Sequence, residues 1–289
     1  MMTSIRSKQA ILIAVTLLLI GFLFTRDIKG LVEPTAENGK QDAPVEQQPA
    51  TAQISLEEAS KTAKNLINTS IATQITAIEE RYQNASGVQK VAEAKLLAQK
   101  WDDVEQSIPS SLYLEIVAKA EPALNNWLNA GNSFLKAFDN LPEDEASRGV
   151  MLQKANTSFT SALALDSTSN DAKTGLGITI VNGLGAPMQG IAMLMDVIKK
   201  DPKNLKANMN LGMFAIKSGQ FDKAITRFND IIANIKATPD AYFYLATAYE
   251  SLGKNKEAID AYLNSKKLAA NTTLSSFIDK KVAELESKR

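Results

Sequence analysis

The sequence predicts an all-α protein in which pairs of helices stack into an α-α superhelix. The segments 210–228 and 244–262 each have the pattern of a helix, a glycine turn and a second helix. Matching residues in the two segments lie 34 positions apart, among them Leu211 and Leu245, Gly219 and Gly253, Ala224 and Ala258, and Phe228 and Tyr262. A fixed period of this length is typical of repeat proteins, whose units bury their apolar faces only by stacking.

The N-terminus predicts a membrane anchor at residues 10–25, after a short flank at residues 1–9. Arg6 and Lys8 precede an uncharged apolar run from Ala10 to Phe24. The run is shorter than the roughly 17–25 residues of a full crossing, which favours a cleaved signal. No small-x-small cleavage pattern follows, which favours an uncleaved signal-anchor. We therefore expect a single-pass inner (cytoplasmic) membrane protein with its bulk in the periplasm, an orientation that depends only on the terminal amine.

Residues 26–53 are expected to be a disordered linker. The stretch from Glu33 to Gln53 is rich in Pro, Gln, Ala and acidic residues and has few large apolar side chains. Such a composition cannot bury enough apolar surface to fold, and its prolines keep the chain extended. It would hold the folded part away from the lipid headgroups.

Residues 54–120 are predicted to form a helical region that begins as a hairpin. "SLEE" from Ser55 is a capping box, in which the Ser hydroxyl accepts from the Glu58 amide. One long helix is expected from there to the break near Gly87, a second over residues 88–106 and a third over residues 111–120. The isoleucines of the first helix recur at helical spacing, at Ile67, Ile71, Ile75 and Ile78.

Residues 121–272 are predicted to hold four repeat units, with bounds at 121–169, 170–204, 205–238 and 239–272. The last two keep the 34-residue period. The second is one residue longer between Gly177 and Gly190, and the first carries an inserted turn, "DNLPEDEASRG", at residues 139–149. Small residues such as Gly212 and Ala246 would let helix backbones approach, with aromatic side chains filling the space beside them.

Residues 273–289 are predicted to cap the stack with a final helix. Four of its apolar side chains fall on one stripe, and its charged residues lie outside that stripe. A repeat array needs such a cap because its last unit would otherwise leave an apolar face exposed. The stripe consists of Leu274, Ile278, Val282 and Leu285.

The repeats resemble the tetratricopeptide (TPR) family, whose pattern W-x2-L-G-x2-Y, A-x3-F, P has this length. Tyr242, Leu245, Ala246 and Tyr249 satisfy its first part, and Ala258 and Tyr262 its second. With the N-terminal span and linker, the chain also resembles membrane-anchored TPR proteins of the Bacteroidota. This resemblance implies a membrane-anchored scaffold that binds a protein or peptide partner in the concave groove lined by the first helix of each unit.

Candidate partner-binding residues lie beside the packing stripe of each first helix, at the i, i+4, i+7 spacing of one helical face. The surface would be largely apolar, and an apolar or amphipathic peptide would fit it. An equally weighted alternative is that these side chains only pack between adjacent first helices. They are Leu128, Asn132, Leu135, Thr174, Ile178, Val181, Met209, Met213, Ile216, Phe243, Thr247 and Glu250.

The sequence argues against one specialised site and leaves one alternative function open. Some relatives of the resembled family hold a C-terminal carboxylate with five residues. Asn132 and Lys206 match two of these, but Leu128, Gly175 and Asn210 fill the others, which leaves a single positive charge. In the alternative function, the N-terminal helices pair between chains as a coiled coil, making the protein a self-assembling envelope component and a homo-oligomer.

Composition argues against several other functions. The chain has no Cys and no His, which removes thiolate catalysis, disulfides, the usual general base and the usual metal ligands. Thirty-two basic residues balance thirty-two acidic ones, and no basic stripe is present, so nucleic acid is not an expected partner. We expect no enzyme activity, no cofactor and no metal site.

Overall fold

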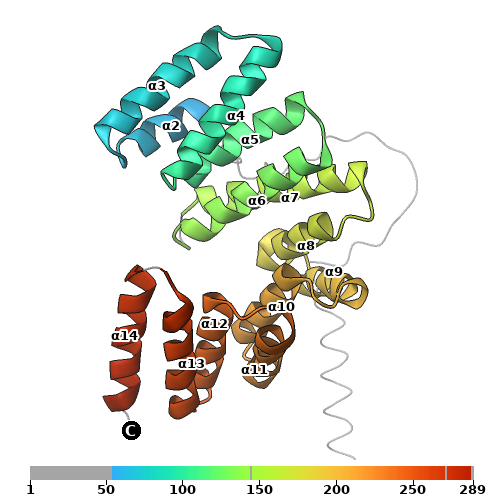
Figure 1. The fold of residues 1–289 in the computed structure, drawn as a ribbon. Coiled ribbons are helices and arrows are strands. Elements are labelled where there is room, and N and C mark those ends of the chain that lie inside the picture. The colour runs from blue at the N-terminus through green and yellow to red at the C-terminus, as the bar shows by residue number, and fades with distance from the viewer. Residues whose placement is uncertain (1–53, 144, 271, 288–289) are drawn as a thin grey trace, which may run out of the picture. The chain divides into compact units, whose positions relative to one another are not determined.

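The computed structural model describes residues 54–143, 145–270 and 272–287, and over these residues it contains helices and no strands (Figure 1). The predicted anchor and linker, residues 10–25 and 26–53, lie outside them. None of the described helices is long and apolar enough to cross a membrane. The elements in chain order are α2 (Leu56–Lys64), α3 (Thr69–Asn84), α4 (Gly87–Asp103), α5 (Ser107–Ala120), α6 (Leu124–Asn140), α7 (Ser147–Leu165), α8 (Asn170–Thr179), η1 (Ile180–Leu184), α9 (Pro187–Lys200), α10 (Leu205–Lys217), α11 (Phe221–Asp230), η2 (Ile231–Ile235), α12 (Pro239–Ser251), α13 (Asn255–Leu268) and α14 (Thr272–Ser287).

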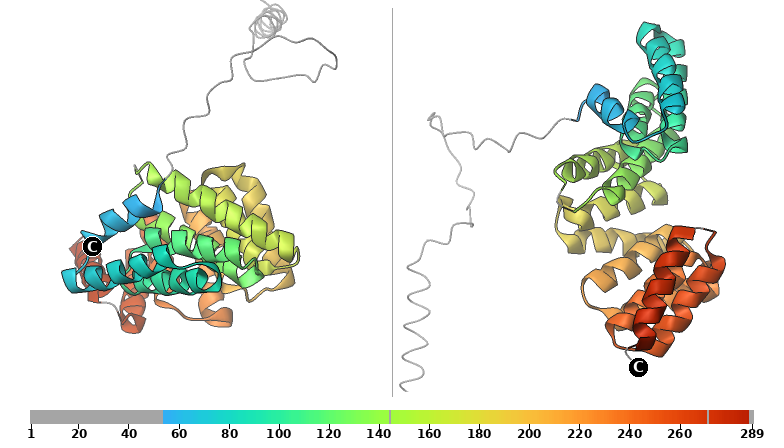
Figure 2. Two further views of the ribbon diagram at one scale, coloured as in Figure 1. Left: turned by 90° about the horizontal axis from the view of Figure 1, so that it is seen from above. Right: turned by 90° about the vertical axis from the view of Figure 1, so that its left-hand side faces the viewer.

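From α3 onward, each helix packs against the next helix along the chain. The first helix of one pair also contacts the first helix of the following pair. Thus α6 touches α8 as well as α7, and α10 touches α12 as well as α11. Figure 2 shows this succession from two further directions. This is the arrangement of stacked helical pairs that the 34-residue period predicts.

The single long helix predicted from Ser55 to about Gly87 is wrong. The chain forms α2 and α3 instead, separated by a turn at residues 65–68 in which the Asn68 side chain caps α3 by accepting from the Ser70 amide at 2.8 Å. Asn at this position favours a new helix start, because its side-chain oxygen can accept a hydrogen bond from a main-chain amide in the first turn, where the amides have no partner within the helix. The predicted cap at Ser55 is confirmed, since it accepts from the Glu58 amide at 3.1 Å.

Close helix crossings occur where the sequence places glycine opposite an aromatic ring. A methyl group on Gly175 would lie 2.3 Å from the Phe159 ring, and one on Gly212 would lie 2.6 Å from the Phe228 ring. Both rings are fully buried. The prediction that small residues open space for aromatics is therefore confirmed at these two crossings.

The inserted turn of the first unit is shorter than predicted. Helix α6 ends at Asn140 and α7 begins at Ser147, so both ends of the predicted turn, residues 139–140 and 147–149, are helical. In the second unit, η1 follows α8 directly, and Gly183 within η1 interrupts the helical path with a φ of 135°. The chain then reaches α9, which begins at Pro187.

The isoleucines that could have formed a seam between chains are used inside the molecule. Ile75 and Ile78 are buried in a cluster with Leu97 and Trp101, and Ile67 and Ile71 pack against that cluster. The apolar side of α3 is thus covered by α4 and α5 of the same chain. A coiled coil built on these residues would first have to open this core.

The C-terminal helix α14 covers the last helical pair. Ile278 and Leu285 are buried, and Leu274 and Val282 pack against the same cluster. These four residues form the stripe that the sequence predicts for the capping helix. The cluster they join includes Ala246, Ala258 and Tyr262 of α12 and α13.

Candidate functional site

A hollow opens on the first helices α6, α8 and α10, the wall for which the sequence predicts partner binding. Its volume is about 380 Å³. Asn132 and Leu135 of α6, Ile178 of α8, and Lys206 and Asn210 of α10 line it, so residues up to 78 positions apart in sequence (210 minus 132) meet there. The remaining lining residues are Lys136, Asp139 and Asn140.

A second hollow, of about 400 Å³, adjoins the first. It lies between α4, α5 and α6, and it shares Asn132 and Lys136 with the first hollow. Gln99 and Asn129 are among its other lining residues. The two hollows therefore form a continuous surface from α4 to α10, which we call the inner wall.

The structure distributes the twelve predicted residues over three environments. Asn132 alone is exposed, while Leu135, Thr174 and Ile178 are buried. Leu135 and Ile178 still border the first hollow, whereas Thr174 is fully buried and packs between helices. The other eight are half-buried: Leu128, Val181, Met209, Met213, Ile216, Phe243, Thr247 and Glu250.

The C-terminal part of the predicted wall is occupied by the capping helix. Phe243 contacts Phe277 of α14, with ring centroids 5.9 Å apart. Glu250 accepts hydrogen bonds from the Tyr262 hydroxyl at 2.7 Å and from the Lys281 ammonium at 2.9 Å. Phe243 and Glu250 thus pack between adjacent helices, which is the alternative that the sequence leaves open for these positions.

Most side chains that line the two hollows are polar or charged, although carbon atoms contribute the larger part of the exposed lining. Asn129 has no side-chain hydrogen bond to any described residue, and the Asn132 carboxamide accepts from Lys206 but donates to none of them. Asn210 donates to the Lys206 carbonyl at 2.8 Å and keeps its own side-chain oxygen free among the described residues. Apolar inner-wall positions are instead the ones that neighbouring helices cover.

Two charged groups face the first hollow without an ion-pair partner within 4 Å among the described residues. Burial lowers the pKa of Lys206, against the opposing influence of Asp171 and Asp139. Burial likewise raises the pKa of Asp139, although Arg148, Lys217 and Lys206 oppose that shift. Both side chains reach solvent at the surface, but the surrounding wall reduces the hydration of their charges. Each charge is therefore available to a partner at reduced desolvation cost.

Several inner-wall residues are absent from the set that the sequence predicts. Three lining residues lie outside the i, i+4, i+7 triplets: Asn129, Asp139 and Asn210. Each is on a helix that carries a predicted residue, and each borders one of the two hollows. Phe277 could have been found, because it lies 34 positions after Phe243. The period thus continues into α14, for which the stripe predicts only a capping role.

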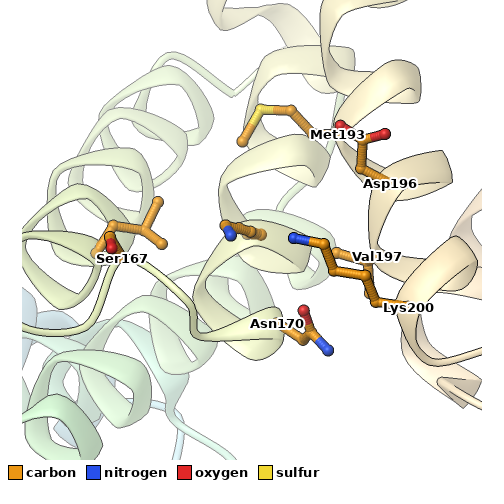
Figure 3. Close-up of a pocket in the computed structure, with 8 residues that line it drawn as sticks. Ser167, Asn170, Met193, Asp196, Val197 and Lys200 are labelled. Atoms are coloured by element: carbon orange, nitrogen blue, oxygen red, sulfur yellow. The ribbon is translucent and has the colours of Figure 1, made fainter.

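A smaller hollow of about 260 Å³ lies where α7 ends and α8 begins, against α9. Figure 3 shows Met193, Val197 and Lys200 of α9 facing Ser167 and Asn170 across it. None of the twelve predicted residues lines this hollow. It is separate from the inner wall.

Comparison with known proteins agrees with the repeat architecture. Residues 240–272 match the family model described as Tetratricopeptide repeat. Among solved structures, a thermophilic TPR protein in Thermus thermophilus is similar, with a TM-score of 0.54 and 15% identity, covering 67% of this chain and 99% of that one. PilW, a type IV pilus biogenesis factor, is similar with a TM-score of 0.50 and 20% identity, covering 70% and 93%. No curated protein matches the sequence.

Over the described residues, the stacked helical pairs are similar to those of TPR solenoids, and residues 240–272 match one tetratricopeptide unit. The family match covers the last complete helical pair, α12 and α13. At 15% and 20% identity, the similar structures support the fold alone.

Proposed function

We propose that this protein is a membrane-tethered, non-enzymatic scaffold that binds a segment of a partner protein along the inner wall. The observation that carries the proposal is the hollow on α6, α8 and α10, where Asn132, Lys206 and Asn210 offer groups that no described residue fully satisfies. A concave surface with a few convergent polar groups is the usual form of a binding site. In repeat proteins such a surface extends along several units.

The partner segment in this proposal is peptide-like and polar on the side that meets the wall. The Asn129 carboxamide and the Asn132 side-chain NH2 group, which have no hydrogen-bond partner among the described residues, can pair with the main chain of a bound segment. The charges on the wall are nearly balanced, since Lys136 is paired with Asp102 at 2.6 Å and Lys206 faces Asp139 across the same hollow. A strongly charged polymer would therefore gain little there.

A photo-crosslinking experiment tests this proposal. We would place p-benzoylphenylalanine at Asn132 and, as a matched control, at the exposed Gln153 of the second helix α7. In cells that make the full chain, the proposal expects a discrete adduct from position 132 that is lost in the Lys206→Glu variant, and none from position 153. Equal adducts at both positions, or an adduct indifferent to Lys206→Glu, would contradict it.

The membrane tether is part of the same proposal and has its own test. The uncharged run Ala10–Phe24 and the resemblance to membrane-anchored TPR proteins of the Bacteroidota support it. The full chain should stay in the membrane fraction after alkaline carbonate extraction, and a chain lacking residues 1–25 should be released. Protease added to spheroplasts should cut the linker if the bulk is periplasmic. Loss of an N-terminal tag would instead indicate a cleaved signal.

A further inference from the structure

A third hollow lies away from the first helices' shared opening, between α2, the start of α5 and the end of α6. Its volume is about 600 Å³. Ile108 and Leu141 give it apolar walls, and Leu66, in the turn between α2 and α3, stands beside it with 71% of its surface exposed. The exposed part of the Leu66 side chain adds apolar surface to the edge of this hollow that a bound molecule could contact.

The charge around this hollow has a single sign. Glu58, Glu105 and Glu145 line it, and of the residues that the structure describes no Lys or Arg does. None of the three carboxylates has an ion pair within 4 Å among the described residues; Glu145 accepts only from the Ser147 hydroxyl, at 3.1 Å. The nearby cation Arg148 is engaged elsewhere, because it donates to the Leu141 carbonyl and lies 3.9 Å from the centre of the Phe138 ring.

Other occupants fit these observations less well. Among the described residues, no group of three or more acidic side chains is placed to hold a metal ion, so the three glutamates act at separate points of the rim. A nucleic acid or an anionic lipid surface would be repelled by them. Docking of a second copy of the chain is one of the outcomes that the experiment below distinguishes.

We propose that this hollow, which we call the acidic hollow, docks a basic amphipathic segment of a partner protein. Apolar side chains of the segment contact Leu66, Ile108 and Leu141, and its Lys or Arg side chains reach the three carboxylates. The carboxylates set orientation and rate of association, and the apolar contact supplies affinity. The proposal does not depend on the inner wall, because the two surfaces share only Asn140.

The test measures binding of a defined probe to the full chain in phosphatidylcholine nanodiscs. The probe is the fluorescein-labelled peptide GKLLKKLLKG, followed by fluorescence anisotropy, with empty discs as background. We expect the triple variant Glu58→Gln, Glu105→Gln, Glu145→Gln to raise Kd about tenfold at low salt, and Leu66→Ser to raise it about threefold. The peptides GQLLQQLLQG and GKSSKKSSKG, which lack the charge or the apolar side chains, should both bind about tenfold more weakly.

Matched control variants distinguish binding at the acidic hollow from nonspecific electrostatic or hydrophobic binding elsewhere on the protein. Glu80→Gln, Glu257→Gln, Glu286→Gln removes the same charge from exposed sites elsewhere, and Leu263→Ser removes a leucine that is 46% exposed on α13. Both should leave Kd within about twofold of the unaltered chain. Equal loss in test and control variants, or no loss in either, overturns the proposal. A dimer of the unaltered chain that Leu66→Ser converts to monomer would also overturn it, because a second copy would then cover the hollow.

Discussion

The N-terminal and C-terminal repeat units carry corresponding positions on their first helices but use them differently. In α12, Glu250 is bound by Tyr262 and Lys281, and Phe243 is covered by Phe277. In α6 and α10, the side chains of Asn129, Asn132 and Asn210 keep free hydrogen-bonding groups. Lys206 has no carboxylate within 4 Å; both statements refer to the described residues. The difference teaches that a repeat position becomes a candidate binding residue only where no neighbouring helix satisfies it.

The largest expected effect tests a packing contact that two different units share. Phe159 and Phe228 are both fully buried and both pack on a glycine of a facing helix. We expect Phe159→Ala and Phe228→Ala each to lower the free energy of unfolding by about 3–5 kcal/mol, through lost burial and a remaining cavity. Urea titration followed by circular dichroism measures this. A cost under about 1 kcal/mol at either site would show that the units are packed by different rules.

The next effect should appear only in the C-terminal region. Glu250→Ala leaves the Tyr262 hydroxyl, on a residue that is 1% exposed, without its acceptor. We expect a loss of about 1–3 kcal/mol in the free energy of unfolding, because a buried donor would be left unsatisfied. Glu250→Gln keeps an acceptor and should recover most of the loss. Asn132→Ala is the N-terminal counterpart and should change stability by less than about 0.5 kcal/mol. Equal costs for Glu250→Ala and Asn132→Ala would contradict the comparison.

A gain in stability is expected inside the N-terminal region. Thr174 is fully buried, and its hydroxyl has no hydrogen-bond partner among the described residues. Valine has nearly the same shape without the polar group, so Thr174→Val should raise the free energy of unfolding by about 1 kcal/mol. Thermal melting of the two proteins side by side measures it. A lower melting temperature for the variant would mean that the hydroxyl is hydrogen-bonded, for instance to a buried water.

The smallest effect concerns pH. Burial raises the pKa of Asp139 above its usual value of 3.8, so ionising this carboxyl costs stability in the folded state. That cost is present above the raised pKa and disappears as pH falls through it toward the unfolded value. Asp139→Asn should therefore be slightly more stable than the unaltered chain at neutral pH, by less than about 0.5 kcal/mol for so accessible a group, and lose this advantage below pH about 4. An advantage that grows on acidification would reverse the assigned sign.

The helical pairs, the glycine-aromatic crossings and the stripe of the capping helix can be predicted from the sequence, because each depends on local spacing and residue size. The break between α2 and α3 could not be predicted in this way. Ile67 and Ile71 stand on either side of the start of α3, yet they keep the helical spacing, so one apolar face continues through the turn and hides it. Asn68 is a residue type that often begins a helix, as Ser55 does. It lies inside the continuous apolar pattern, however, and that pattern predicts an unbroken helix.

Exposure along the inner wall could not be predicted from spacing alone. Leu135 and Asn132 belong to the same predicted triplet, yet one is buried and the other exposed. Which face of a first helix remains open depends on which side chains of the neighbouring helical pairs cover it. For α6 these come from α5, α7 and α8, so the covering residues are spread over several helices of the chain.

The buried helix crossings and the exposed carboxamides of the inner wall lie on different faces of the same helices. This has a practical consequence for engineering. Positions 129, 132 and 210 stand on helices whose opposite sides are already closed by glycine, alanine and aromatic contacts. Randomising these three codons would diversify recognition while leaving the folding units intact. The chain thus offers a ready framework for selecting new binders in the laboratory.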